Sequence, residues 1–277
     1  MDRADLLLIL WAALGFVVTY GLLWVYQWRR QDATIVDVGW PYSLAAAVLF
    51  FGLVTDGPLA HRLLWAILPA LWAARLGTHI LTRRVLSKEG EDPRYRALRR
   101  HWGKHADLHF IWFFQAQGLA NIFLTAPILL LMKNPQPGLS SWEIVGAVIV
   151  IASVALERVA DNQLHAWKSN PQNKGITCRK GLWRYSRHPN YFFEWCHWLA
   201  YPVAGLALLD TSLAPWWPLT LLGPVLMFIL LVKGTGIPFA EQQSLEHRGE
   251  DYRRYQQETH AFFPWFPRKP ARPVQPS

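Results

Sequence analysis

The sequence predicts an all-α integral membrane protein: a seven-helix transmembrane bundle with its N-terminus outside and its C-terminus in the cytoplasm. Hydrophobic residues make up 52% of the 277 residues, and apolar runs long enough to cross a bilayer recur between short charged segments. The loops after the first, third, fifth and seventh runs hold 23 Lys and Arg residues, whereas the N-terminal segment and the other loops hold 3. Because cytoplasmic loops carry the excess of Lys and Arg, this distribution gives the orientation.

The expected spans are separated by polar connections, of which 82–109 and 160–188 are the longest. In chain order they cover residues 6–28, 33–54, 63–81, 110–132, 142–159, 189–209 and 215–232. Residues 1–267 are expected to form a single seven-span membrane domain with cytoplasmic loops and tail. The Pro-rich residues 268–277 are expected to be a disordered C-terminal end.

Local signals support the start or end of individual spans. Two arginines end the first span, and the Pro/Gly-rich turn 134–138 follows the fourth. Ser140 precedes the fifth span, with Glu143 in a capping position. Pro189 suits the first turn of the sixth span, because the N–H that proline lacks would be unpaired there.

The composition excludes several other classes of protein. The net charge of +9 is explained mainly by membrane topology, so nucleic acid is not an expected partner. Two cysteines do not make a disulfide framework. His101, His105 and His109 have the spacing of a helical metal face, but the surrounding cations disfavour a metal ion, and none is expected. The chain has no Gly-x-Gly-x-x-Gly and no P-loop motif.

The stretch 181–194 combines cations, aromatic rings, an amide and a carboxylate where a basic loop enters the sixth span. Asn190 and Glu194 are four residues apart and therefore share one helical face, from which both can reach one ligand. A carboxylate within a span is costly, which favours a functional role. The alternative is an ordinary capped helix after a basic loop.

Acidic residues near the end of the fifth span suggest a second part of the same site. Glu157 and Asp161 are one helical turn apart, and Lys168 lies seven residues further on. The acids can accept hydrogen bonds from ribose hydroxyls or a carboxamide, or they can pair with Arg158. Six loop cations can bind phosphate oxygens or, alternatively, lipid headgroups: Lys168, Lys174, Arg179, Lys180, Arg184 and Arg187.

A polar stripe on the third span suggests where chemistry occurs. Arg75, His79 and Arg83 recur every four residues, and Asp37 in the second span is their expected partner. The four residues form either a structural ion pair or the reacting end of a pocket, with Asp37 or His79 donating to a substrate oxygen. Tyr95 is a further candidate for the phenolic donor.

From Glu157 to Glu194 the chain resembles the steroid 5-alpha-reductase family, in particular its bacterial membrane branch. The acid pair, the basic loop and the Asn190-x-x-x-Glu194 pair occur in that family's order, and the tail around Glu241 and Tyr252 matches more weakly. The resemblance implies a reductase of lipid or steroid metabolism in the bacterial inner membrane, with its active site open to the cytoplasm. The enzyme would use NADPH to reduce the C=C bond of a lipophilic α,β-unsaturated ketone, a 3-oxo-Δ4 steroid or similar lipid taken from the bilayer.

The resemblance also implies roles for individual residues. The cofactor would be held by Glu157, Asp161, Lys168, Arg179, Asn190, Tyr191, Glu194, Glu241 and Tyr252. Hydride would pass to the β carbon of the ketone while a donor stabilises the developing enolate, with Asp37, His79 and Tyr95 as catalytic candidates. The steroid enzymes carry a Gln-Glu pair on the second span, where this chain offers only Asp37.

Two other interpretations remain open. Isoprenylcysteine carboxyl methyltransferases also have an Arg-His-Pro-x-Tyr entry to a span, like Arg187 to Tyr191, which allows an S-adenosylmethionine-dependent membrane methyltransferase acting on isoprenylcysteine or a phospholipid. A lipid-binding or assembly protein without activity is the third interpretation. Membrane lipids and a lipophilic small molecule are the expected partners of a monomer.

Overall fold

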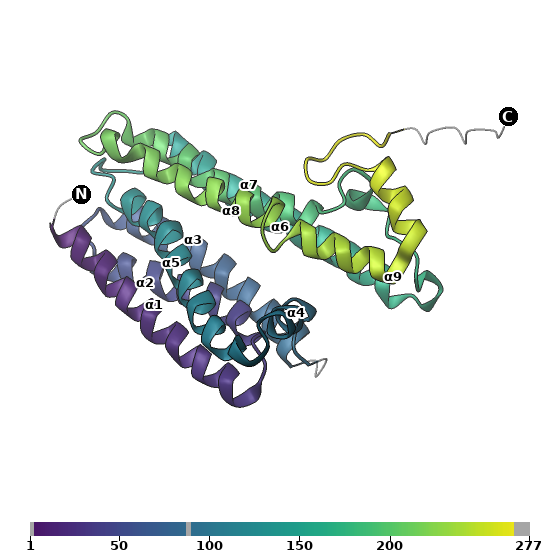
Figure 1. The fold of residues 1–277 in the computed structure, drawn as a ribbon. Helices are drawn as coiled ribbons and strands as arrows, with labels where there is room; N and C mark the ends of the chain where they lie inside the picture. Colours follow the sequence, from purple (N-terminus) through teal and green to yellow (C-terminus); the bar gives the residue numbers. More distant parts are fainter. Residues whose placement is uncertain (1–2, 87–89, 269–277) are drawn as a thin grey trace. The chain divides into compact units, whose positions relative to one another are not determined.

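The computed structural model describes residues 3–86 and 90–268, and these residues contain helices but no strands. The α-helices are α1 (Arg3–Arg30), α2 (Ile35–Val54), α3 (Leu59–Ile80), α4 (Pro93–Trp102), α5 (Ala106–Met132), α6 (Ser141–Ser169), α7 (Pro189–Gly205), α8 (Leu222–Val232) and α9 (Ile237–Glu258) (Figure 1). A π-helical turn at Leu81–Val85 extends α3, and a 3₁₀ segment at Ala214–Leu221 leads into α8. The all-α prediction is therefore confirmed. Apart from residue 268, the expected disordered end at 268–277 lies outside the described residues.

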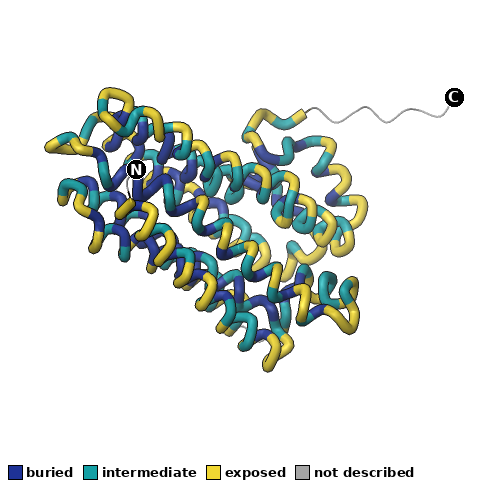
Figure 2. The backbone as a smooth tube through the Cα atoms, turned by 60° about the vertical axis from the view of Figure 1, so that its left-hand side comes forward, coloured by how far each residue is buried: buried dark blue, intermediate teal, exposed yellow. Residues whose placement is uncertain are grey.

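Five helical segments are long and apolar enough to cross a membrane: Arg3–Arg30, Ile35–Val54, Leu59–Val85, Pro93–Met132 and Ala214–Glu258. Large apolar side chains on α1 and α2 point outward, with Trp11 62% exposed and Leu53 78% exposed. Figure 2 shows that exposed positions recur along the helices and not only in the loops. Extensive exposed apolar surface of this kind marks contact with lipid. The chain is therefore a multi-pass membrane protein by its fold and surface.

Helices α6 and α7 do not belong to this apolar set of described segments. Helix α6 carries Glu143, Glu157 and Arg158 within its apolar half. Helix α7 has 17 residues, which span roughly 26 Å at about 1.5 Å per residue, less than a hydrocarbon core of about 30 Å. The predicted sixth span, 189–209, ends earlier as an α-helix because a 3₁₀ turn follows Gly205.

The chain divides into two compact units, and each is described by itself. The first unit comprises residues 1–147 and 201–223, and the second comprises residues 148–200 and 224–277. In the first unit, α2 packs against α1, α3 and α5. A Cβ atom at Gly52 would lie 2.5 Å from the Cβ of Ala66, so glycine permits the close approach of α2 and α3. Trp65, Tyr20 and Phe114 are fully buried in this core.

The start of α6 confirms the capping signal in the sequence. The backbone N–H of Glu143 donates to Ser140 Oγ at 3.2 Å, and Ser140 N donates to Glu143 Oε2 at 3.1 Å. The same carboxylate accepts hydrogen bonds from Trp65 Nε1 at 3.1 Å and Asn134 Nδ2 at 3.2 Å, and it lies 2.7 Å from His61 Nδ1. Glu143 and His61 have no exposed surface. This cluster therefore ties the end of α5 and the start of α6 to α3.

In the second unit, the chain after α9 folds back on the loop before α7. Arg187 N donates to the carbonyl of His260 at 2.8 Å, and Trp265 N donates to the carbonyl of Tyr185 at 2.9 Å. The phenol of Tyr255 donates to the carbonyl of Trp183. Aromatic rings of α7, α8 and the C-terminal segment pack together, for example Phe192 with Phe262 at 5.7 Å between ring centroids. These contacts fix the 181–188 loop from which α7 begins.

Candidate functional site

Helices α6 and α7 meet through a hydrogen bond between two of the predicted ligand-binding residues. Asn190 Nδ2 donates to Asp161 Oδ1 at 3.1 Å. The Oδ1 atom of Asn190 is buried and accepts no hydrogen bond from the described residues. Glu157 lies one turn from Asp161 on α6 and is 4% exposed, and Glu194 lies one turn from Asn190 on α7 and is half-buried. Each of the two hydrogen-bonded residues thus has a carboxylate one helical turn away on its own helix.

The local sequence explains why Asn190 stands in this position. Ser186 Oγ accepts a hydrogen bond from His188 N at 3.1 Å, which satisfies one of the first N–H groups ahead of the helix. Pro189 is the first residue of α7, as the sequence predicts. Gly181 has a φ of 59°, and a Cβ there would lie 2.4 Å from Gln163 Oε1. Without that Cβ, Gln163 Oε1 accepts a hydrogen bond from Leu182 N at 2.8 Å, which ties the loop to α6.

A second cluster joins the loop to α9 around Glu241. Its Oε1 atom lies 2.6 Å from Arg187 Nε and 3.3 Å from His188 Nε2, and its Oε2 atom accepts from Gln256 Nε2 at 2.7 Å. Arg187 Nη1 also donates to the carbonyl of Thr259 at 2.6 Å. Burial lowers the pKa of His188 below its ordinary value, against the opposing effect of Glu241. Glu241 therefore positions Arg187 and His188.

Tyr191 extends this cluster on α7. Its ring stacks on the imidazole of His188, with ring centroids 5.5 Å apart and an angle of 11° between the planes. Through His188, the stacked pair joins the first turn of α7 to the Glu241 cluster.

Arg179 and Tyr252, two further predicted cofactor residues, lie in a third cluster. Arg179 Nη1 lies 2.8 Å from Asp251 Oδ1, and Arg179 Nη2 donates to the Asp251 carbonyl at 2.7 Å. The guanidinium stands over the ring of Tyr255, 5.4 Å from its centroid. Tyr252 is 3% exposed and packs edge-on against Tyr255 at 5.8 Å. Through these contacts, Arg179 holds the loop before α7 against α9.

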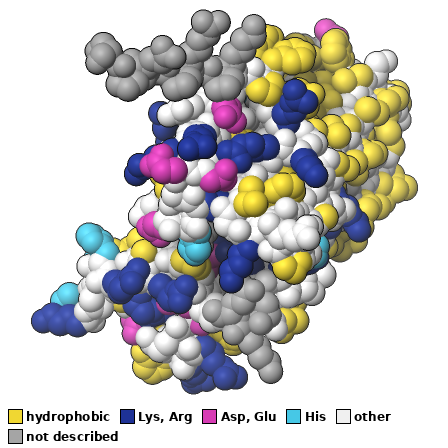
Figure 3. Space-filling model, turned by 90° about the vertical axis from the view of Figure 1, so that its right-hand side faces the viewer, with side chains coloured by type: hydrophobic (Ala, Val, Ile, Leu, Met, Phe, Trp, Pro, Cys, Tyr) yellow, Lys and Arg dark blue, Asp and Glu magenta, His cyan; other side chains and the backbone are white. Residues whose placement is uncertain are grey.

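Other loop cations remain on the surface. Lys168, Lys174, Lys180 and Arg184 are exposed, and Lys180 Nζ stands 5.4 Å from the ring centroid of Trp167. Figure 3 shows Lys and Arg side chains beside Asp and Glu side chains on one face of the molecule. These four cations are thus accessible from solvent, whereas Arg179 and Arg187 are held in ion pairs with acids of α9.

In the first unit, two predicted catalytic residues are hydrogen-bonded to each other. The Tyr95 phenol donates to Asp37 Oδ1 at 2.5 Å, and Arg94 Nη2 donates to Asp37 Oδ2 at 2.6 Å. Tyr95 is 3% exposed and packs against Phe110. Asp37 therefore takes its partners from α4 and not from the polar stripe on α3. His79, the third candidate, lies exposed in the last turn of α3.

Asp92 organises the start of α4 behind this pair. It caps the helix by accepting from Arg94 N at 2.9 Å, and its Oδ1 also lies 3.0 Å from Arg94 Nε. The backbone N–H of Asp92 donates to Thr34 Oγ1 at 2.8 Å. Burial acts to raise the pKa of Asp92, but hydrogen bonds and charge from Arg94, together with the charge of Arg84, hold it below its usual value. Arg94 is thus fixed between two carboxylates.

Sequence reasoning did not assign Arg94 and Gln256 to these clusters. The Asp92-Pro93 pair does carry a usable signal, because an N-cap followed by proline at the first helical position places Arg94 and Tyr95 in the first turn of a helix. No comparable local signal exists for Gln256, which reaches Glu241 from the far end of α9.

The fold and these clusters define an all-α, multi-pass membrane protein with polar groups collected at helix ends. A family model described as "Protein of unknown function (DUF1295)" matches residues 23–259, and the chain therefore belongs to this family. An uncharacterised protein of Schizosaccharomyces pombe is 25% identical over 276 residues, covering 91% of this chain and 78% of that protein. No solved structure matches.

The expected membership of the steroid 5-alpha-reductase family is wrong, because the family that matches most of the chain is the DUF1295 family. The resemblance rested on a small set of acids, cations and a proline around one helix start. Several of these residues meet structural needs within the chain: Pro189 starts α7, Arg179 pairs with Asp251, and Glu241 pairs with Arg187. These residue types alone therefore do not identify the family.

Proposed function

We propose that the protein is a membrane-embedded oxidoreductase that uses NADPH to reduce the C=C bond of a lipophilic α,β-unsaturated ketone. The observation that carries the proposal is the contact between α6 and α7, where Asn190 and Asp161 are hydrogen-bonded and a carboxylate lies one turn away on each helix. Carboxylates accept hydrogen bonds from ribose hydroxyls, and an amide can both donate to and accept from a nicotinamide carboxamide.

The charge of the neighbouring loop supports a phosphorylated nucleotide over S-adenosylmethionine. NADPH carries a pyrophosphate and a 2′-phosphate, whereas S-adenosylmethionine carries no phosphate. The exposed cations Lys168, Lys174, Lys180 and Arg184 suit such an anion. Tyr191, stacked on His188, offers a flat apolar face for a ring.

The Asp37 cluster supports a role in proton donation. When bound, NADPH would supply the hydride that enters at the β carbon of the substrate. In the reaction Tyr95 would turn its one O–H from Asp37 to the ketone oxygen, where negative charge develops, and the α carbon would then take a proton from water, so that the C=C bond becomes CH–CH. Asp37 would position the phenol before the reaction, since it accepts the hydrogen bond from Tyr95, and Arg94 would hold the Asp37 carboxylate in place.

The distribution of Lys and Arg supports the orientation that goes with this activity. Seven spans with the C-terminus in the cytoplasm would put the 160–188 loop and α9 on the cytoplasmic side, where NADPH is available. The apolar, outward-facing side chains of α1 and α2 would contact lipid, from which a lipophilic substrate can enter.

Nucleotide titration of the purified protein in detergent tests the cofactor. A ligand that binds only the folded state adds about 2.7 kcal/mol at one hundred times its dissociation constant, so NADPH should raise the melting temperature more than NADH or S-adenosylmethionine at equal concentration. Asn190→Ala should reduce the NADPH shift. Asn162→Ala is the matched control, because Asn162 is exposed on α6 beside Asp161.

Two results would overturn the proposal. An equal or larger shift with S-adenosylmethionine would favour the methyltransferase interpretation. An NADPH shift that Asn190→Ala and Asn162→Ala leave equally large would show that the nucleotide binds elsewhere.

A further inference from the structure

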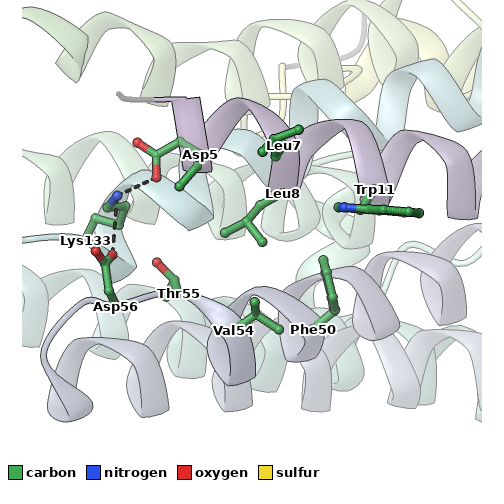
Figure 4. Close-up of a pocket in the computed structure, with 10 residues that line it drawn as sticks. Asp5, Leu7, Leu8, Trp11, Phe50, Val54, Thr55, Asp56 and Lys133 are labelled. Atoms are coloured by element: carbon green, nitrogen blue, oxygen red, sulfur yellow. Dashed lines mark hydrogen bonds and ion pairs between the residues drawn. The ribbon is translucent and has the colours of Figure 1, made fainter.

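A groove lies at one end of the first unit, where α1 begins and where α2 and α5 end. It has a volume of about 510 Å³, within the range of roughly 300–1,000 Å³ that small-molecule sites occupy. Figure 4 shows its polar side chains gathered at one end and its apolar side chains continuing along α1 and α2. The groove can therefore accommodate an amphiphile, with the polar group of the ligand at the polar end and its hydrocarbon chain along the apolar part.

The apolar part of the groove is open to the surroundings of the helices. It is lined by Leu7, Leu8, Trp11, Phe50 and Val54. Trp11 is 62% exposed and Val54 is 54% exposed. From Leu7 to Trp11 the groove follows about one turn of α1, roughly 6 Å at about 1.5 Å per residue. An extended hydrocarbon chain in the bilayer can lie along this surface without leaving the lipid.

The polar end is built around Lys133, directly after α5. Its Nζ atom lies 2.5 Å from Asp5 Oδ1 and 3.4 Å from Asp56 Oδ1. The two carboxylates differ, because the Asp5 side chain is 4% exposed and the Asp56 side chain is 82% exposed. Asp5 therefore fixes the ammonium in place, while Asp56 is a weaker partner that can turn to a ligand.

Thr55 provides an independent sign of a ligand. The residue is 3% exposed and lines the groove, and its Oγ1 atom is buried without a hydrogen-bond partner among the described residues. A buried hydroxyl without a partner costs about 1–3 kcal/mol. A ligand with a polar group at this end of the groove would remove that cost.

The charges at this end select the kind of headgroup. Among the described residues that line the groove, Asp5 and Asp56 are the carboxylates and Lys133 is the cation, so a purely anionic headgroup would meet excess negative charge. A headgroup that carries its own cation avoids this repulsion. Its phosphate can accept from Thr55 Oγ1 and Lys133 Nζ, and its ammonium can donate to Asp56.

We propose that this groove binds one membrane phospholipid with a primary-ammonium headgroup, of the phosphatidylethanolamine class. One acyl chain lies along α1 and α2, and the zwitterionic headgroup meets Thr55, Lys133 and Asp56. The site is separate from the α6–α7 contact, and its occupancy does not depend on the proposed reductase activity. A primary ammonium is preferred to choline, because a trimethylated nitrogen has no N–H to donate to Asp56.

Lipid retention tests the site. The protein is reconstituted in nanodiscs of phosphatidylcholine that contain equal minor amounts of phosphatidylethanolamine and phosphatidylglycerol, then extracted in detergent, and the retained lipids are measured by mass spectrometry. Phosphatidylethanolamine should be enriched about tenfold over each of the other two, which corresponds to about 1.4 kcal/mol. Lys133→Met should abolish the enrichment, whereas Lys104→Met, which removes an exposed cation elsewhere in the first unit, should leave it unchanged.

Asp56→Asn provides a second variant that does not disturb the core, since the Asp56 side chain is 82% exposed. It should reduce the preference for phosphatidylethanolamine over phosphatidylcholine while lipid is still retained. Equal retention of phosphatidylglycerol and phosphatidylethanolamine by the unmodified protein would overturn the headgroup assignment. Retention that survives both Lys133→Met and Asp56→Asn, or no retention of any lipid, would overturn the site.

Discussion

Replacing Tyr95 with phenylalanine removes one hydroxyl from the Asp37 cluster and little else. The ring of Tyr95 packs against Phe110 and Phe113, with centroids 6.2 Å and 6.0 Å away, and phenylalanine keeps these contacts. The hydrogen bond to Asp37, at 2.5 Å, is lost, while Arg94 still contacts the carboxylate at 2.6 Å. A hydrogen bond to a charged group contributes about 1.5–3 kcal/mol. The melting temperature should fall by roughly 3–12 °C, given about 2–4 °C per kcal/mol for a chain of this size.

Activity separates a catalytic phenol from a structural one. If Tyr95 stabilises the developing enolate, Tyr95→Phe should lower kcat about 10²- to 10³-fold, as the loss of an oxyanion donor does elsewhere. Thermal denaturation and NADPH oxidation with a panel of lipophilic enones measure the two effects on the same preparations. Tyr26→Phe is the matched control, because Tyr26 is 41% exposed on α1. A loss of stability with kcat unchanged would refute the catalytic role, and unchanged stability would refute the assigned hydrogen bond.

Three further predictions concern stability. Glu143→Leu should destabilise the first unit by about 3–5 kcal/mol or abolish folding, because it leaves His61 and the other buried donors without their acceptor; the yield of folded protein and the melting temperature report this. Acidification should destabilise the second unit, because the pKa of His188 is lower in the folded chain than in the unfolded chain. The unfolded chain takes up this proton at about pH 6.5, whereas the folded chain does not. The contribution of His188 to the free energy of unfolding is therefore fully present above about pH 6.5 and is lost as the pH falls toward the folded pKa. A His188→Gln variant should show a flatter melting temperature between pH 5 and pH 7, in the range where that proton is taken up. Gly52→Val should separate α2 from α3 and lower the melting temperature, because a Cβ would meet Ala66 at 2.5 Å, whereas Gly15→Val on α1, where a Cβ meets nothing within 4 Å, should be tolerated.

Local chemistry predicts much of the fold. The lengths of the apolar runs predicted the helices α1, α2 and α5. The Ser140–Glu143 pair and Pro189 predicted the starts of α6 and α7. Each of these signals acts within a few residues of the position it determines. The seven-span count and the orientation stay predictions, because length and polarity place α6 and α7 outside the five clearly apolar segments.

The partners of charged side chains could not be predicted in the same way. Asp37 pairs with Arg94, 57 residues away, and Arg179 with Asp251, 72 residues away. The sequence offered several cations for each acid, and only the packing of the helices selects one. This is also why the resemblance to a known family misled: the residue types were recognisable, but their contacts depend on long-range packing.

The fate of the transferred hydrogen tests the central proposal most directly. The purified protein is incubated with NADPH deuterated at the reactive position of its nicotinamide and with a lipophilic enone, and the product is analysed by mass spectrometry and NMR. The account predicts a product with one deuterium at the former β carbon. It also predicts that Asn190→Ala forms little of this deuterated product, because the variant binds NADPH weakly. A reduced product without deuterium at that carbon, or methyl transfer from S-adenosylmethionine in place of reduction, would contradict it.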